Sequence, residues 1–387
     1  MSTKVFFSRR VPYALDRFRH LLKSSSSSIP VNIQCFDSED QAIPRDEILR
    51  QVKGCSALFC LLTDRIDDEL LDAAGPSLRV VSTMSVGYNH IDIAACEARG
   101  IRVGHTPGVL DVSTAETGVA LTFAAKRRLV ECVDSARNGE WGVWQPFQYC
   151  GTDVTGCTVG IIGLGRIGMT YARMMKFGFN CKIIYSGPNE KPEHVAALGG
   201  DVEYVDLDTL LAQSDIVSVH IPLNESTRAS MNARRFAQMK DGAVFINTSR
   251  GEVVDQDALY QALKTKQIAA AGLDVTAPEP LPTDHALFTL PNCVILPHVG
   301  SATVKTRQAM ADIAVQNLLA GKQTTLDFYA RISQIARLSM SLYKCVCSPH
   351  DVRMTIQTLQ KQFKDFKFRR YCFGMWRNQV STWRSSY

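Results

Sequence analysis

Short apolar runs alternate with amphipathic segments along the first hundred residues. The runs are rich in Val, Ile, Leu and Phe, and they predict strands at residues 5–8, 31–36, 57–62, 79–83 and 101–103. Between them, residues 46–52, 67–74 and 91–99 have the spacing of helices. Strands that are apolar throughout are buried on both faces, so this half predicts a parallel sheet covered by helices.

A second alternating series follows a long helix that we expect at residues 113–130, capped by Ser113 or Thr114. Six further strands are predicted, at residues 158–162, 182–185, 216–220, 243–247, 271–275 and 293–296. Six strands separated by helices match a dinucleotide-binding fold. A helix at 303–319 could cross back to the first domain. The pattern therefore predicts an α/β protein with two doubly wound parallel-sheet domains around a ligand cleft.

Composition supports a globular chain without a membrane span. Of 387 residues, 45% are apolar and 21% charged, and the apolar runs are too short to cross a bilayer. The first ten residues carry arginines where a secretory signal would be apolar, so we expect a cytoplasmic protein. Its 12 cysteines are scattered, which indicates reduced thiols and no metal site.

The net charge of +5 is unevenly distributed. Residues 324–387 hold eleven Lys and Arg against three Asp, whereas residues 1–323 hold 32 basic against 35 acidic side chains. The main body thus gives no electrostatic reason to expect nucleic acid or a membrane as partner. Residues 361–370 of the tail, KQFKDFKFRR, could form a basic-aromatic patch for either, and the alternative is an appended segment without a selected role.

The stretch TVGIIGLGRIG, residues 158–168, places a glycine-rich turn between a strand and a helix. Gly163 permits the tight turn, Gly165 lets a pyrophosphate approach the backbone, and Gly168 lets helix and strand pack closely. The helix N-terminus supplies free N–H groups for the phosphates. The motif predicts binding of a nicotinamide dinucleotide.

The end of the second nucleotide strand, KIIYSGPNEK, bears on the choice of cofactor. Ser186 lies where NAD-binding sites usually present an acid, and Lys191 could pair with a 2′-phosphate. Glu190 weakens that interpretation. We therefore expect NADP, with NAD possible at a permissive site.

Two loops after later strands carry candidate catalytic groups. Arg250, in NTSRG, ends a buried strand, where its planar fork suits a substrate carboxylate; a salt bridge to a neighbouring helix is the alternative. His298, in ILPHVGSAT, follows another strand and could donate a proton, or could simply cap that strand. Glu279, between two prolines, could hold the imidazole in one tautomer.

Two segments facing the expected cleft are less specific. Residues 84–87, Met-Ser-Val-Gly, could bind a carboxylate through backbone N–H groups or could form an ordinary glycine turn. His220 ends a strand and is expected to line the cofactor cleft.

Taken in order, these motifs resemble the D-2-hydroxyacid dehydrogenase family over about residues 4–323. The stretches that carry the likeness are STMSVGYNHID, GIRVGHTPGVL, TVGIIGLGRIG, INTSRGEVV, AAAGLDVTAPEPLPT and CVILPHVGSAT. The likeness is greatest to members that reduce glyoxylate to glycolate and hydroxypyruvate to D-glycerate. It implies a small 2-oxo acid substrate and a homodimer formed largely through the nucleotide domain.

The resemblance also implies a division of the chain and of the site. Residues 1–112 with 303–323 would form a flavodoxin-like substrate domain, and residues 113–302 a Rossmann domain. Arg250 would bind the 2-oxo acid, His298 would be the acid/base, and Glu279 would tune it. The implied substrate contacts are Val86, Gly87, Arg250, Asp274, His298 and Ser301. The implied cofactor contacts are Gly163, Gly165, Arg166, Ile167, Gly168, Ser186, Lys191, Pro222, Thr248, Asp274 and Gly300.

Some alternatives remain open at this level. Another activity of the family is possible, such as that of a 3-phosphoglycerate or D-lactate dehydrogenase. Corepressors built on this fold bind NAD(H) without catalysis and can retain the Arg–Glu–His set. The sequence after Lys322 departs from the family, so residues 324–387 are expected to lie outside the family fold.

Overall fold

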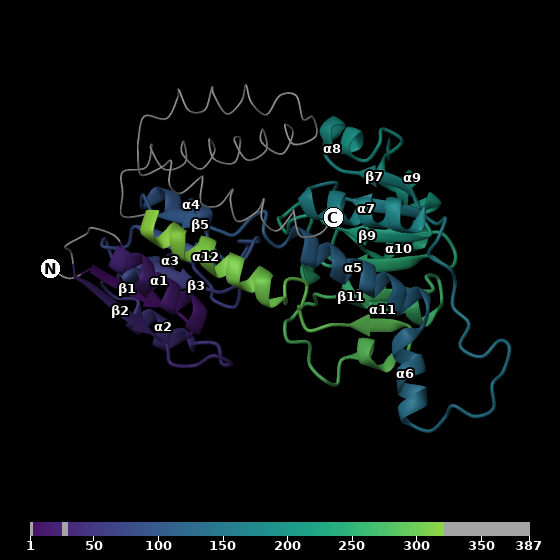
Figure 1. The fold of residues 1–387 in the computed structure, drawn as a ribbon, viewed down its shortest axis with the longest axis horizontal. Coiled ribbons are helices and arrows are strands. Elements are labelled where there is room, and N and C mark those ends of the chain that lie inside the picture. The colour runs from purple at the N-terminus through teal and green to yellow at the C-terminus, as the bar shows by residue number, and fades with distance from the viewer. Residues whose placement is uncertain (1–2, 25–29, 321–387) are drawn as a thin grey trace, which may run out of the picture. The chain divides into compact units, whose positions relative to one another are not determined.

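The computed structural model describes residues 3–24 and 30–320, which contain two parallel β-sheets with helices on both faces (Figure 1). The predicted α/β class is confirmed. The basic tail predicted at 324–387 lies outside the described residues. No helix in the described part of the chain is long and apolar enough to cross a membrane.

The first sheet has five strands in the order β2-β1-β3-β4-β5. Their bounds are Thr3–Phe7 (β1), Val31–Cys35 (β2), Ala57–Cys60 (β3), Val80–Thr83 (β4) and Arg102–Gly104 (β5). All neighbouring pairs are parallel. β3 and β4 are buried along their whole length, which is why neither shows an apolar-polar alternation. β3 is apolar throughout, and β4 ends in the buried polar residues Ser82 and Thr83.

Alternate residues of these strands feed two separate cores. Phe6 packs with the helices Arg45–Gln51 (α2), Asp68–Ala74 (α3) and Ile93–Ala98 (α4) on one face. Its neighbours Val5 and Phe7 point to the other face, because successive strand side chains alternate. That face is covered by the helices Pro12–Ser24 (α1) and Val304–Ala320 (α12), which come from the two ends of the described chain (Figure 1).

The second sheet has seven strands in the order β12-β11-β10-β9-β6-β7-β8. Their bounds are Thr158–Ile162 (β6), Lys182–Ser186 (β7), Glu203–Tyr204 (β8), Ile216–Val219 (β9), Val244–Asn247 (β10), Ala270–Leu273 (β11) and Cys293–Ile295 (β12). The strand order reverses between β6 and β9. In open parallel sheets a ligand binds at such a switch point, beyond the carboxyl ends of the strands.

Helices cover both faces of this sheet as well. Asp111–Lys126 (α5) and Arg166–Phe179 (α7) pack on one face, and Leu207–Gln213 (α9), Ala233–Gln238 (α10) and Gln256–Lys264 (α11) pack on the other. Pro192–Ala197 (α8) follows β7. Within the described residues, five helices begin at an Asp or Asn whose side chain accepts a first-turn N–H, namely α3, α4, α9, α10 and α11. These caps explain why each of the five helices begins directly after a short polar side chain in the sequence.

Three sequence expectations need correction. The predicted helix 113–130 is two helices, α5 and Leu129–Arg137 (α6), because Arg128 between them has a φ of 53°. The predicted helix extended to residue 130 because Leu129 and Val130 are apolar and continue the sequence pattern of α5. Since α5 begins at Asp111, Ser113 and Thr114 lie inside it and cap nothing.

The other differences concern elements without a clear apolar signature. The second sheet has seven strands rather than six, because the two-residue β8 is exposed and carries no apolar run. Helix α1 was not predicted.

Candidate active site

A cavity of about 460 Å³ lies between loops of the first sheet and the carboxyl ends of the second. One wall comes from residues 84–89, after β4, and the opposite wall from the loops after β9, β10, β11 and β12. The first turns of α5, α7 and α12 complete it through Thr114, Ile167 and Arg307. Ser113 Oγ and Thr306 Oγ1 are 2.7 Å apart, so α5, which packs on the second sheet, and α12, which packs on the first, are joined at this point.

The glycine turn between β6 and α7 has the shape that the sequence predicts. Gly163 has a φ of 95°, and a Cβ there would lie 2.7 Å from Ile221. A Cβ on Gly168 would lie 2.3 Å from the Gly163 carbonyl oxygen, so helix and strand approach as closely as they do because both residues are glycines. A Cβ on Gly165 would meet nothing within 4 Å. The turn is therefore open on the side from which a phosphate would approach.

The N-terminus of α7 offers donors to an anion. The N–H groups of Arg166, Ile167 and Gly168 have no acceptor among the described residues, and no side chain caps the helix. Arg166 Nε lies 3.4 Å from Asp111 Oδ2. Burial raises the pKa of Asp111, and Arg166 opposes that shift. The free N–H groups and the helix dipole make this end electropositive.

The loop after β7 is fixed by two tyrosines. The Lys191 N–H donates to Tyr185 Oη (3.0 Å), and Tyr204 Oη donates to the Gly187 carbonyl (2.7 Å). Ser186 is buried, whereas the side chain of Lys191 is exposed. Residues 186–188 therefore present no carboxylate. The exposed cation of this loop is Lys191, and Glu190 lies next to it.

Two buried polar atoms at the inner end of the cavity have no hydrogen-bond partner among the described residues. They are Nδ1 of His220 and Oγ1 of Thr248, and both residues line the cavity. His220 Nε2 lies 2.9 Å from Ser218 Oγ. A buried polar atom without a hydrogen bond lowers the free energy of unfolding, so such atoms usually have a partner. The position of these two atoms fits a bound polar ring that would form hydrogen bonds with them. Together with the glycine turn, these atoms fit a nicotinamide dinucleotide.

Arg250 reaches across the cavity to the loop after β4. Its Nε donates to Asn89 Oδ1 (2.9 Å) and its Nη1 to the Ser249 carbonyl (2.7 Å). The guanidinium lies on Gly87, because a Cβ at that position would be 1.9 Å from Arg250 Nη2. Arg250 pairs with no described carboxylate, so the salt-bridge alternative is not what the structure shows. Burial lowers its pKa, against the opposing effect of Glu279 and Glu252.

The loop opposite Arg250 presents backbone donors. Ser85 Oγ donates to the Gly87 carbonyl (2.6 Å), and the Val86 carbonyl lies 2.9 Å from His105 Nδ1. These contacts turn both carbonyls away, while the N–H groups of Val86 and Gly87 have no acceptor among the described residues. An anion beside Arg250 would find these donors unoccupied.

His298 and Glu279 meet as the sequence suggested. His298 Nδ1 lies 2.8 Å from Glu279 Oε2, and Glu279 Oε1 accepts the Thr276 N–H (3.0 Å). Burial alone would raise the pKa of Glu279, but the hydrogen bond and charge of His298, the Thr276 N–H and Arg250 outweigh it, and the net pKa is lowered. An ionised Glu279 keeps the proton on Nδ1 and leaves Nε2 for the cavity.

Asp274 positions the histidine loop. Its carboxylate accepts the N–H groups of Val299 (2.7 Å) and Gly300 (2.8 Å), and its backbone carbonyl accepts the His298 N–H. These contacts hold His298 at a φ of 54°, a conformation that costs an L-residue about 1–2 kcal/mol. Burial raises the pKa of Asp274. Asp274 lines the cavity, but its two oxygens already accept these backbone donors.

The predicted residues divide into two groups. Ten line the cavity: Val86, Gly87, Ile167, Pro222, Thr248, Arg250, Asp274, His298, Gly300 and Ser301. Seven do not: Gly163, Gly165, Arg166, Gly168, Ser186, Lys191 and Glu279. Glu279 reaches the cavity through its hydrogen bond to His298 and through its charge, which acts on Arg250, and the other six belong to the glycine turn and the loop after β7.

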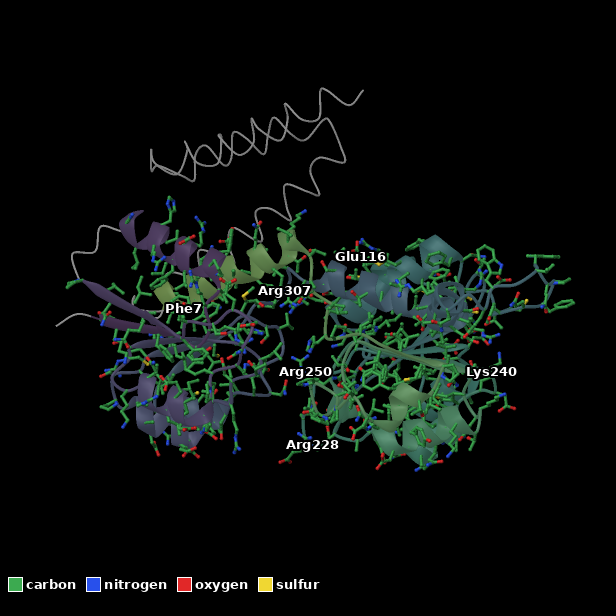
Figure 2. All side chains as sticks on the ribbon, turned by 90° about the horizontal axis from the view of Figure 1, so that it is seen from below. Phe7, Glu116, Arg228, Lys240, Arg250 and Arg307 are labelled. Atoms are coloured by element: carbon green, nitrogen blue, oxygen red, sulfur yellow. The ribbon has the colours of Figure 1, made fainter. Side chains whose placement is uncertain are left out.

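Sequence reasoning missed several residues of the site. Asn89 anchors Arg250, and His105 fixes the Val86 carbonyl. Arg307 brings a second guanidinium to the cavity (Figure 2). Asn89 lies two residues after Gly87, so its presence in the same loop was the available signal; Arg307 had none beyond its position near the start of a helix.

Two buried histidines should make stability depend on pH. Burial lowers the pKa of His90 to about 4 and that of His220 to about 3, below the ordinary value of 6.5. The unfolded chain therefore binds protons that the folded chain does not, and the free energy of unfolding falls as pH decreases below about 6.5. Between pH 7 and pH 5 each histidine should contribute a loss of about 2 kcal/mol. Denaturant unfolding of the parent and His220→Gln measures this, and an equally steep pH dependence in the variant would contradict it.

The fold and the site together define a class of protein. A glycine turn at the switch point of a seven-stranded sheet, an arginine with free backbone donors opposite it, and a carboxylate-held histidine are the parts of a nicotinamide-dependent dehydrogenase acting on 2-hydroxy acids.

Comparison with known proteins agrees with this class. Residues 119–300 match the model of the D-isomer specific 2-hydroxyacid dehydrogenase NAD-binding domain. The chain is 49% identical to the human glyoxylate reductase/hydroxypyruvate reductase over 319 residues, which are 82% of this chain and 94% of the human protein. The chain belongs to the D-isomer-specific 2-hydroxyacid dehydrogenase family.

Solved structures show the same relationship. A glyoxylate reductase from Paecilomyes thermophila is 30% identical with a TM-score of 0.73, covering 84% of this chain and 96% of that one. An NADPH-dependent glyoxylate/hydroxypyruvate reductase from Sinorhizobium meliloti, in complex with NADP and malonate, is also 30% identical with a TM-score of 0.69. It covers 84% of this chain and 95% of its own.

Proposed function

We propose that this protein reduces glyoxylate to glycolate and hydroxypyruvate to D-glycerate. The observation that carries the proposal is the convergence of Arg250 and the His298–Glu279 pair on one cavity beside the glycine turn. The reductase activities of the human, Paecilomyes and Sinorhizobium relatives support it.

The substrate carboxylate lies between Arg250 and the N–H groups of Val86 and Gly87 in this proposal. A guanidinium binds a carboxylate through two parallel hydrogen bonds, and the Asn89 contact fixes its orientation before the substrate arrives. Ser301 lines the cavity from the histidine loop and adds a hydroxyl donor. This arrangement aims the 2-oxo group at His298 and polarises it.

His298 supplies the proton. Glu279 holds Nδ1, so the imidazolium presents its Nε2 proton to the substrate oxygen. Proton transfer from a positioned histidine contributes on the order of 10²–10⁴ in rate. In the reverse direction the neutral imidazole accepts the hydroxyl proton.

The cofactor sites follow the fitted geometry. Gly163, Gly165, Gly168 and the α7 N–H groups of Arg166 and Ile167 would hold the pyrophosphate. Pro222, Thr248, Asp274 and Gly300 would enclose the nicotinamide. A bound reduced nicotinamide supplies the hydride.

NADPH is the cofactor that the loop after β7 favours in this proposal. Ser186 presents no carboxylate to repel a 2′-phosphate, and Lys191 is exposed and available to pair with it. NAD(H) remains acceptable, because one lysine is a modest attraction and Glu190 lies beside it. The value of kcat/KM measured with NADPH should exceed that with NADH; the reverse order would contradict the preference.

The larger organisation is inferred in the same way. We assign residues 1–112 with 303–323 to the substrate domain and 113–302 to the cofactor domain. The segment between α6 and β6 exposes four large apolar side chains that are 70–87% accessible: Trp141, Val143, Trp144 and Phe147. This exposure favours a homodimer through the cofactor domain. Sedimentation equilibrium would measure that oligomeric state.

The free cysteines of the described residues suit the reducing cytosol, which cell fractionation would test.

Oxidation of NADPH and NADH by the purified protein tests the function. Absorbance at the nicotinamide band should fall when glyoxylate or hydroxypyruvate is added. D-glycerate and glycolate are then identified in the products. Faster turnover of 3-phosphohydroxypyruvate or pyruvate would point to another activity of the family, and cofactor binding without turnover of any acid would favour a corepressor-like role.

A further inference from the structure

Arg307 lies on the face of α12 that lines the cavity. Its neighbour Thr306 is buried and bonded to Ser113, which fixes the start of the helix against α5. Met310, three residues on, is 2% exposed and lines the same cavity. Because residues three apart share a helix face, the Arg307 side chain is held on the cavity side.

The Arg307 guanidinium has no partner in the part of the chain that the structure describes. It is half-buried, and it forms neither a hydrogen bond nor an ion pair with any described residue. Arg17, which faces the same helix, is paired instead with Asp312 at 2.9 Å. Burial lowers the pKa of Arg307, against the attraction of Asp274. None of its nitrogens is sealed from solvent, so its donors open toward the cavity.

The charge of the cavity points the same way. Among the described residues that line it, Arg250 and Arg307 are the Lys and Arg side chains, and Asp274 is the acid. Both Asp274 oxygens already accept backbone N–H groups. In the proposed function Arg250 and the Val86 and Gly87 N–H groups account for the substrate carboxylate, which leaves the second guanidinium without a role.

We propose that Arg307 binds an oxygen substituent at C3 of the 2-oxo acid and thereby selects hydroxypyruvate over pyruvate. The inference rests on the proposed reductase activity. A C3 hydroxyl can accept from the guanidinium, whereas a methyl group leaves these half-buried donors unpaired. A site that hydrogen-bonds a hydroxyl discriminates strongly against the analogue without it. Glyoxylate has no C3 and would use Arg250 and His298 without Arg307.

The test compares three acids in Arg307→Gln, with Arg79→Gln as the matched control. Arg79 is exposed on the first domain, away from the cavity. In Arg307→Gln the ratio of kcat/KM for hydroxypyruvate to that for pyruvate should fall about 10- to 100-fold, the effect of one charge-assisted hydrogen bond. The value for glyoxylate should fall less than that for hydroxypyruvate, because glyoxylate loses only the general attraction of the second positive charge, and Arg79→Gln should behave as the parent.

Each other outcome overturns the inference. An unchanged ratio shows that Arg307 does not contact C3, and an equal loss with glyoxylate shows that it acts on a step common to all substrates. Because the readout is a ratio within one preparation, partial misfolding does not affect it. If the parent reduces none of the three acids, the proposed function itself fails; if it reduces glyoxylate and the ratio does not move, only the role of Arg307 fails.

Discussion

Replacing His298 with asparagine should lower kcat for glyoxylate by about 10²–10⁴. The variant removes the proton donor while keeping the backbone, because Asn tolerates the left-handed φ of 54° better than most residues. Stopped-flow or steady-state oxidation of NADPH measures the loss. The Kd for NADPH, followed by nicotinamide fluorescence, should remain close to that of the parent, since the proposed function assigns His298 to the substrate and not to the cofactor.

Two further variants distinguish a loss of catalysis from a loss of folding. Glu279→Gln should lose less activity than His298→Asn, because the carboxylate acts by holding the imidazole. His285→Asn is the matched control: His285 Nδ1 accepts the Leu287 N–H in a short turn, and the residue does not line the cavity. Full activity in a folded His298→Asn variant would exclude His298 as the proton donor.

Replacing Arg250 with lysine should lower kcat/KM for glyoxylate by about 10²–10⁴. Lysine keeps a positive charge but cannot bind a carboxylate bidentately, and it cannot keep both the Asn89 and Ser249 contacts. Most of the loss should appear in KM, with a further loss in kcat because the 2-oxo group is no longer aimed at His298. Initial rates over a range of glyoxylate concentrations give both constants.

Arg228→Lys provides the corresponding control. Arg228 is exposed, lies between β9 and α10, and does not line the cavity (Figure 2). It should match the parent in both constants. A parental kcat/KM in Arg250→Lys, with the fold intact by circular dichroism, would place the substrate carboxylate elsewhere.

The local features of this protein could be predicted from its sequence. The fully buried strands β3, β4, β9, β10 and β11 are recognisable because apolar residues predominate in them. Their few polar residues, such as Ser82 and Ser218, are buried as well and do not alternate with the apolar ones. The glycine turn was predictable because its conformation requires Gly163 and Gly168 whatever surrounds them. Two features could not be predicted because their local sequence signal is weak. β8 consists of two exposed residues without an apolar run. The break at Arg128 depends on one backbone angle, and the apolar residues that follow it continue the helical pattern of the sequence.

The sequence by itself determined two parallel sheets, the phosphate turn and the candidate pair His298 and Glu279, because each depends on residues close in the chain or on strand ends that share one sheet edge. Only the tertiary structure decided what those groups face. Arg250 meets Asn89 across 161 positions of sequence, and α12 returns to cover the first sheet, bringing Arg307 into the cavity. Such contacts depend on how the two sheets and their helices pack together. They join residues that are far apart in the sequence, so the local pattern of apolar and polar residues does not predict them.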